Sequence, residues 1–343
     1  MKKIGIGIIL IGLGIVVGWI GNDILSFLND YVSPKGVRSE RHMSKLHNFD
    51  ETPFWISKDK IGYVSNSQIW MVELDKLDHI QLSVTGECSS FPPFPIAIAD
   101  KYVVFIGNTG YLWIVDIATK REKLLVKKKI RWFSSISDRE SISYIIEGEK
   151  YLHVLNLQTG VDSRIEESIQ PYWSWSPDGK RIIYRGRKWW SWSPDGEKIA
   201  YRGCEEICIM NVTTGKIKKI AKGGFYPSWS PCGDKIIFFR PCKKIGIWEI
   251  WIINHDGKGE RLLDKCEKNT GVRKHKIISW SPNGKQFTYD DDKKNGIIWV
   301  INVENKKKIR LSKSPYCSSP AWSPDGKRIV FDRLGRIFVA TLD

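Results

Sequence analysis

One short string dominates the sequence: Trp-Ser-Pro, then a variable residue, then Gly. Its five copies begin at Trp175, Trp192, Trp229, Trp280 and Trp322. Ser, Pro, Asp and Gly in this order suit a type I turn, because Pro presets φ at the second position and Gly tolerates positive φ at the end. The string therefore predicts a turn that joins two short strands.

An alternating apolar run follows each turn and ends in an aromatic residue, as in K-I-A-Y at residues 198–201. A second apolar run comes next, such as I-C-I-M at residues 207–210, and a more polar run such as K-I-K-K-I-A from Lys216 closes most units. Alternation with period two indicates strands, and four antiparallel strands in one repeat form a propeller blade. We therefore predict an all-β fold, a β-propeller of four-stranded antiparallel blades.

The spacing of the units sets the number of blades. Weaker copies place the Trp position near Trp55, Ile96 and Ser135. Neighbouring units begin 37 to 51 residues apart, except for a step of 17 between Trp175 and Trp192. The short step leaves room for a hairpin alone, at about residues 171–187. We predict seven blades plus this hairpin, and eight blades with one incomplete is the alternative.

The last unit has three predicted strands before Asp343. A strand from residues around Arg41 to Asp50, just before the first blade, is expected to supply its missing outer strand. This pairing would close the ring and cover an open sheet edge.

These repeats resemble the WD-like repeats of TolB-type propellers, from about residue 45 to residue 343. The resemblance implies a binding scaffold, usually outside the cytoplasmic membrane. The same repeat also forms the accessory propeller of prolyl-oligopeptidase-like peptidases, whose chemistry lies in an α/β-hydrolase domain for which this chain has no room. TolB has an additional N-terminal domain, whereas about 20 residues separate the apolar segment from the first blade here.

The N-terminus is apolar: residues 4–21 carry no charge. A membrane span needs about 20 such residues, so we predict an anchor helix at residues 1–30, a linker at 31–44 and the propeller at 45–343. A cleaved signal peptide is the rival interpretation, but no A-x-A-like cleavage site follows. Flanking Lys and Arg do not fix the orientation. We expect a single-pass protein of the cell membrane with its propeller on the extracytoplasmic side.

The formal charge of +16 favours anionic partners, such as acidic proteins or envelope polymers. A Lys-rich composition, which places Lys on every solvated face, is the simpler explanation of this charge. Nucleic acid is not an expected partner, and the sequence leaves the oligomeric state open.

Motifs of catalysis are absent from the sequence: it has no G-x-S-x-G, P-loop, H-E-x-x-H or G-x-G-x-x-G. The six His are dispersed, and the repeated Asp178, Asp195 and Asp325 are expected to stabilise their turns. We therefore expect no enzyme, no cofactor and no metal site. A polysaccharide lyase or hydrolase acting at the propeller channel is one alternative, and an accessory subunit of an envelope complex is another.

Aromatic and basic residues precede several of the first strands, where the loops should lie at the mouth of the channel. The candidate binding residues are Trp132, Tyr172, Trp189, Tyr226, Tyr316, Arg131 and Lys188. Aromatic faces beside cations suit sugars or peptides. Packing between blades is the alternative role of these aromatics.

Seven cysteines leave at least one thiol unpaired or paired between chains. Cys204 and Cys208 flank a short segment between two predicted strands, whereas Cys242 and Cys266 fall in the longest unit. Both of the latter are predicted in loops on one face of the propeller. A Cys242–Cys266 disulfide is therefore a candidate, with free thiols as the alternative.

Overall fold

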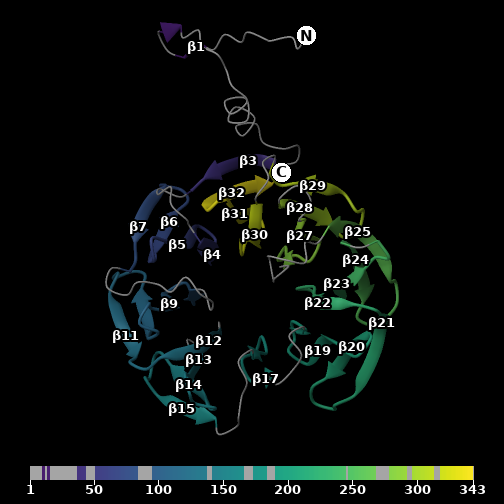
Figure 1. Ribbon diagram of the computed structural model, residues 1–343, viewed down its shortest axis with the longest axis horizontal. Coiled ribbons are helices and arrows are strands. Elements are labelled where there is room, and N and C mark those ends of the chain that lie inside the picture. The colour runs from purple at the N-terminus through teal and green to yellow at the C-terminus, as the bar shows by residue number, and fades with distance from the viewer. Residues whose placement is uncertain are drawn as a thin grey trace.

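The computed structural model is a ring of β-sheets around a central axis (Figure 1). It describes residues 10–11, 14–15, 37–43, 51–83, 95–136, 141–165, 173–183, 190–244, 246–267, 278–291, 296–312 and 317–342. Within these residues, seven sheets have four antiparallel strands each, and an eighth sheet in the ring has two. The predicted propeller of four-stranded blades is confirmed.

The first half of the ring contains three blades and the two-stranded sheet, which we call the short sheet. Blade 1 consists of β4 (Glu51–Ser57), β5 (Lys60–Ser65), β6 (Gln68–Glu73) and β7 (Asp78–Gln81). Blade 2 consists of β8 (Ile96–Ile98), β9 (Tyr102–Ile106), β10 (Leu112–Asp116) and β11 (Glu122–Val126). Blade 3 consists of β12 (Ile130–Ile136), β13 (Ser141–Ile146), β14 (Leu152–Asn156) and β15 (Asp162–Ile165). The short sheet consists of β16 (Ser174–Trp175) and β17 (Ile182–Ile183).

Four further blades complete the ring. Blade 4 consists of β18 (Trp190–Trp192), β19 (Lys198–Arg202), β20 (Glu206–Asn211) and β21 (Ile217–Lys222). Blade 5 consists of β22 (Phe225–Trp229), β23 (Lys235–Pro241), β24 (Ile247–Asn254) and β25 (Arg261–Glu267). Blade 6 consists of β26 (Ser279–Trp280), β27 (Gln286–Asp291), β28 (Ile297–Asn302) and β29 (Lys308–Arg310). Blade 7 consists of β30 (Cys317–Trp322), β31 (Arg328–Arg333), β32 (Arg336–Leu342) and β3 (Val37–His42).

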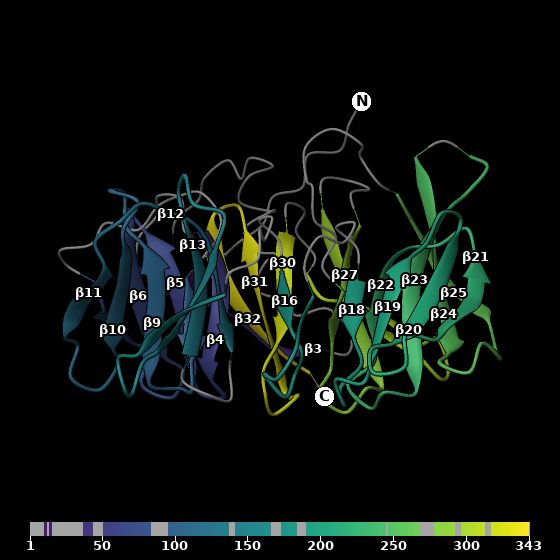
Figure 2. The same cartoon turned by 90° about the horizontal axis from the view of Figure 1, so that it is seen from below.

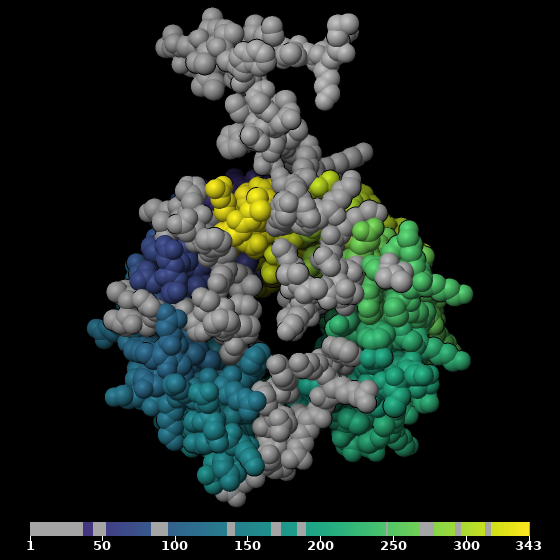
Figure 3. Space-filling view, viewed as in Figure 1, coloured from purple at the N-terminus to yellow at the C-terminus, as the bar shows by residue number. Residues whose placement is uncertain are grey.

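The first strand of a blade lies nearest to the axis, and the later strands follow outward (Figure 1). Seen from the side, the strands run between the two faces of the ring (Figure 2). The space-filling view shows a hollow at the centre (Figure 3). The loops before the first strands and the loops after the second strands therefore share one face.

The predicted turns have a repeated hydrogen-bond pattern, as blade 4 illustrates. Ser193 Oγ donates to Asp195 Oδ1 at 2.5 Å and accepts the Lys198 amide at 2.9 Å, while Asp195 Oδ1 accepts the Glu197 amide. Gly196 follows with φ of 68°, which favours glycine. The repeated Asp residues thus hold turns, as the sequence predicted.

The weaker repeats align as predicted in two of three blades. Trp55 pairs with Ile61 and Ser135 pairs with Ile142, as Trp192 pairs with Ile199 in blade 4. In blade 2 the same position belongs to Ala97, which pairs with Val103, so the predicted Ile96 is wrong by one residue.

Neighbouring blades are joined through an aromatic residue near the end of each second strand, which we call the closing aromatic. In blade 5 this residue is Phe238, which shares a core cluster with Ile207 and Ile209 from the third strand of blade 4. In blade 6 it is Tyr289, which clusters with the third strand of blade 5. The closing aromatics, from blade 1 to blade 7, are Tyr63, Phe105, Tyr144, Tyr201, Phe238, Tyr289 and Phe331.

The ring is closed by β3, which pairs antiparallel with β32 from Val37↔Leu342 to His42↔Phe338. Arg333 Nη1 contacts Glu40 Oε1 at 2.6 Å, and both side chains are at most 9% exposed. Closure by an upstream strand is confirmed. The strand lies at Val37–His42 rather than at residues 41–50, within the segment predicted as a linker.

The short sheet takes a place of its own between blades 3 and 4. Trp175 Nε1 donates to Ser143 Oγ of blade 3 at 2.8 Å, and Trp192 Nε1 of blade 4 donates to the Ser174 carbonyl at 3.3 Å. Complete blades are linked in the same way, since Trp280 Nε1 donates to Ser228 Oγ of the preceding blade. The hairpin is therefore an incomplete eighth blade, which matches the alternative prediction.

The predicted anchor at residues 1–30 lies largely outside the described residues. Its described residues are β1 (Leu10–Ile11) and β2 (Gly14–Ile15), which pair with each other as a two-stranded sheet. In the part of the chain that the structure describes, no helix is long and apolar enough to span a membrane. The structure therefore does not support the predicted helix.

The ion pair at the closing strand generates the first prediction. Glu40→Ala is expected to lower the free energy of unfolding by about 3–5 kcal/mol, because Arg333 would stay buried without its carboxylate. Lys219→Ala removes an exposed contact to Glu206 and should cost less than about 1 kcal/mol. Denaturant unfolding followed by circular dichroism measures both, and equal losses would contradict the role assigned to Glu40.

The turn carboxylates generate a second prediction, on pH. The Ser176 hydroxyl and the Lys180 amide lower the pKa of Asp178. Burial raises the pKa of Asp325, but hydrogen bonds from Ser323 and Lys327 outweigh it and lower the pKa. A carboxyl whose pKa is lower in the folded state stabilises the fold at pH values above the carboxyl's unfolded-state pKa of about 3.9. This contribution to stability is lost as the pH falls through the folded-state pKa.

Replacing Asp178, Asp195 and Asp325 together by Asn should therefore weaken the acid dependence of stability. Asn283 already occupies this turn position in blade 6, where its Oδ1 accepts the Lys285 amide, so Asn fits the turn. We expect the free energy of unfolding to decline less between about pH 5 and pH 2 in the triple variant than in the wild type. Parallel pH profiles would show that these turns contribute no acid sensitivity.

Candidate functional site

The structure describes three of the seven residues predicted at the channel mouth. Arg131 and Trp132 lie near the start of β12, and Tyr226 lies near the start of β22. Arg131 is exposed, whereas the two aromatic side chains are half-buried. The other four lie outside the described residues: Tyr172, Lys188, Trp189 and Tyr316. Ligand binding by this set stays a prediction.

Both described aromatics make packing contacts. Trp132 packs against a cluster that includes Leu152 and Trp173, between blade 3 and the short sheet. The Tyr226 ring lies 6.3 Å from that of Phe239 and 6.4 Å from that of Trp248. The packing role, which was the alternative for these residues, therefore applies at least in part to both of them.

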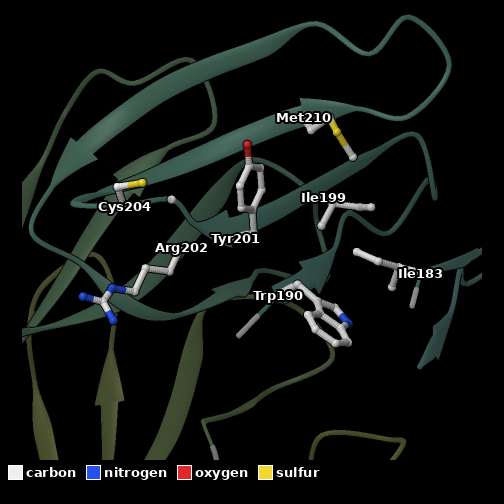
Figure 4. A pocket seen from close by; sticks show the side chains of 8 residues that line it. Ile183, Trp190, Ile199, Tyr201, Arg202, Cys204 and Met210 are labelled. Atoms are coloured by element: carbon white, nitrogen blue, oxygen red, sulfur yellow. The ribbon is translucent and has the colours of Figure 1, made fainter. Parts of the chain in front are cut away.

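A second concave site lies beside the short sheet, and we call it the blade-4 cleft. Its volume is about 390 Å³, within the range of small ligand pockets. Figure 4 shows Trp190, Ile199, Tyr201 and Met210 of blade 4 lining it, with Ile183 of β17 at its side. The remaining lining residues are Arg202, Gly203 and Cys204. Most of this lining is apolar.

Strand pairing explains why these side chains converge. Trp190 pairs with Tyr201 and Ile199 pairs with Met210, so the four side chains share one face of blade 4. The opposite face, which includes Ala200, packs against blade 5. The cleft is thus the face of blade 4 that looks toward the short sheet.

Tyr201 is more exposed than its counterparts in the other blades. The closing aromatics of the six other blades are at most 2% exposed, whereas Tyr201 is half-buried. Met210 is also half-buried, although the corresponding Ile253 and Ile301 are 1% exposed. The short sheet has no third strand in the described residues, so it covers this face incompletely.

Arg202 brings charge to the rim of the cleft. Its guanidinium lies over the Phe225 ring, 3.6 Å from the centroid. Inside the cleft, burial raises the pKa of Tyr201, and the adjacent Cys208 raises it further. Burial likewise raises the pKa of Cys208. Both groups are therefore neutral near pH 7, and neither is an activated nucleophile.

The candidate disulfide is not formed: Cys204, Cys208, Cys242 and Cys266 are all free thiols. Cys266 pairs with Trp248 on one side of β24, whereas Pro241, directly before Cys242, pairs with Trp248 on the other. Two strand spacings separate them by about 10 Å, which exceeds the reach of a disulfide. The predicted Cys242–Cys266 bridge is therefore not present in this structure.

The described histidines belong to separate blades. His153 contacts Glu149 at 3.2 Å and Asp162 at 3.5 Å, and His79 Nδ1 lies 2.9 Å from the Tyr63 hydroxyl. His42 and His255 lie beside aromatic rings. Across the described ranges, no group of three or more His, Cys, Asp or Glu side chains is arranged to hold a metal ion.

Our sequence interpretation missed the blade-4 cleft, although it identified the cause. The step of 17 residues between Trp175 and Trp192 leaves no room for a third and a fourth strand. A face of blade 4 that lacks a covering strand follows from this step. The pattern of the blade 4 strands is as apolar as that of its neighbours, so it gives no separate signal of exposure.

Comparison with known proteins agrees with the repeats. The profile of the family described as the TolB beta propeller domain matches residues 190–331, which confirms the resemblance to TolB-type propellers. The Tol-Pal system protein TolB of Gluconobacter oxydans (strain 621H) is 32% identical over 108 residues. This match covers 29% of this chain and 22% of that protein.

The similar solved structures share little sequence with this chain. An oligogalacturonate lyase in complex with manganese has a TM-score of 0.60 at 15% identity, covering 91% of this chain and 95% of the lyase. The oligogalacturonate lyase of Vibrio parahaemolyticus has a TM-score of 0.58 at 13% identity, covering 90% of this chain and 95% of that lyase. The Cps50 (Swd1) β-propeller domain of Myceliophteria thermophila has a TM-score of 0.53 at 10% identity, covering 89% of this chain and 100% of that domain. These likenesses establish the fold alone.

A substitution separates packing from binding at the channel mouth. Tyr226→Ala should lower the free energy of unfolding by about 2 kcal/mol, because the ring packs against Phe239 and Trp248. Tyr151→Ala, at an exposed position, is the control and should change stability by less than about 1 kcal/mol. Thermal unfolding measures both. An unchanged melting temperature for Tyr226→Ala would favour a ligand-binding role for this ring.

Proposed function

We propose that this chain, whose repeats are of the TolB type, is a non-catalytic binding module that engages a protein or an anionic polymer of the cell envelope. The observation that carries the proposal is the blade-4 cleft. An apolar concave surface beside an incomplete sheet suits recognition, because it leaves side chains uncovered that every other blade buries.

The chemistry of the described residues supports binding rather than catalysis. The His residues lie in different blades and make local contacts. The Tyr201 hydroxyl and the Cys208 thiol are neutral near pH 7, because burial raises the pKa of each. Nucleophiles are commonly activated by a lowered pKa, whereas the pKa of each of these two groups is raised.

The charge of the chain supports an acidic partner. The formal charge is +16, and Arg202 stands at the rim of the cleft. An apolar cavity with a cationic rim suits an apolar segment of a protein with acidic flanks better than it suits a uniformly charged polymer. Nucleic acid is not proposed as a partner.

Residues 1–30 are proposed to tether the propeller to the cell membrane, with the ring on the extracytoplasmic side. Support comes from the uncharged run at residues 4–21 and from the likeness to a Tol-Pal system protein. An accessory role in a larger envelope complex fits the same observations.

A lyase acting on an acidic polysaccharide is the second candidate function. The specific observation in its favour is the likeness in fold to two oligogalacturonate lyases, over at least 90% of this chain. One of those lyases holds manganese. Among the described residues, no group of three or more His, Cys, Asp or Glu side chains is arranged to hold such an ion.

Polygalacturonate distinguishes the two candidates. We expect the purified full-length chain to bind this acidic polymer without cleaving it, with or without added Mn²⁺. Binding should weaken as the ionic strength rises above about 0.1 M, where the Debye length falls below about 10 Å. Affinity electrophoresis measures binding, and absorbance of the unsaturated products measures cleavage.

Each outcome of this experiment has a meaning. Release of unsaturated products would replace the proposed binding function by the lyase. Binding without products supports a binding module with affinity for anionic polymers. The absence of both would remove the polymer from the proposal and leave a protein as the partner.

A further inference from the structure

The six complete junctions between neighbouring blades share one arrangement. The third strand of the earlier blade places two apolar side chains, two residues apart, in the core cluster that contains the closing aromatic of the next blade. The six pairs are Ile69 and Met71, Leu112 and Ile114, Ile207 and Ile209, Ile250 and Ile252, Ile298 and Val300, and Ile337 and Val339. An extended strand with this spacing is therefore what covers a closing aromatic in this fold.

The junction between the short sheet and blade 4 has no such pair in the described residues. The short sheet consists of two strands, and Tyr201 and Met210 are half-buried at this junction. The cleft of about 390 Å³ lies beside them. The space therefore corresponds to the place that a third strand takes elsewhere in the ring.

The outer edge of β17 has backbone groups oriented to pair with a further strand. The Ser176 amide donates to the Arg181 carbonyl, so in an antiparallel ladder the backbone groups of Ile182 point away from β16. Ile199 is the equivalent residue of blade 4, and it pairs outward with Met210 on the third strand of that blade. Ile182 has no such partner strand among the described residues.

We propose that β17 and the blade-4 cleft form a docking site for one extended strand of a partner protein, which completes the eighth blade by β-augmentation. This proposal rests on the binding function proposed above and names its site and its mode. The partner strand carries two aliphatic side chains, two residues apart, which cover Tyr201 and Met210. Acidic residues flank the strand, because Arg202 and a net charge of +16 favour a negative segment.

A peptide taken from the chain itself tests the site. The probe has the sequence I-I-W-V-I-N-V-E of residues 297–304, with two Asp added at each end and a fluorescent label. In blade 6 this segment supplies the pair Ile298 and Val300. We expect saturable binding to the full-length protein in detergent, measured by fluorescence anisotropy. A scrambled peptide of the same composition is expected to bind at least about tenfold more weakly.

Two changes separate strand pairing from nonspecific apolar contact. N-methylation of the peptide at the positions of Trp299 and Ile301 blocks backbone hydrogen bonds and keeps every side chain, and we expect it to weaken binding by about tenfold or more. Met210→Glu should weaken binding similarly, whereas Leu334→Glu, at an exposed position in blade 7, should leave it unchanged. The peptide variant keeps the test valid even if Met210→Glu fails to fold.

Equal binding of the methylated peptide, or no binding of the original peptide, would overturn the docking site. Retained affinity for polygalacturonate in that case would leave the proposed binding function standing. Self-association of the wild-type chain that Met210→Glu abolishes, measured by sedimentation, would identify a second copy as the occupant and would also overturn the proposal of a partner strand.

Discussion

Each sheet of the ring has two apolar faces, and both must be covered by neighbours for the fold to be stable. In β23, Ile236 and Phe238 pack toward blade 4, whereas Ile237 and Phe239 pack toward blade 6. All four side chains are at most 1% exposed. Full burial of one such side chain contributes about 1.5–3 kcal/mol, so a blade without a neighbour loses a large part of its stabilisation. The turns and the closing strand hold the sheets in this arrangement.

In the part of the ring that the structure describes, the arrangement is only partly satisfied at the incomplete blade. The short sheet supplies the inner part of a junction, because Trp175 donates a hydrogen bond to blade 3 and the Ser174 carbonyl accepts one from Trp192 of blade 4. In the described residues, no strand of the short sheet covers the outer part of the blade 4 face. The binding role proposed above would use this surface, which lies away from the central channel.

The local features of the fold could be predicted from the sequence, because the turn string fixes the strands on both sides of it. Ser193, Asp195 and Gly196 each have one role in that turn, and the five copies define the period. Where the string has decayed, the prediction was less accurate, as the shift from Ile96 to Ala97 shows. The closing strand was predicted from the incomplete last unit, but its residues were misplaced because V-R-S-E-R-H is too polar to read as a strand.

The candidate sites were harder to predict, because they depend on which strands lie between two residues. Cys242 and Cys266 lie near each other in the repeat, yet β24 separates them. Tyr201 is exposed where the described part of the neighbouring sheet has no third strand, and the sequence of blade 4 does not encode this. Tyr226 was selected as a channel residue, and its contacts with Phe239 and Trp248 follow from packing within its own blade.

The closing strand must pair with a segment that the ribosome synthesises much later. Glu40 and Arg333, which meet at the closure, lie 293 residues apart in the chain. At a translation rate of about 5–20 residues per second, roughly 15–60 seconds pass between the two residues. During that time β3 has no partner strand, so its backbone edge is open to other chains. Charged side chains blunt an open strand edge, so the polar and charged residues that made this strand hard to recognise suit an edge that stays unpaired until the ring is complete.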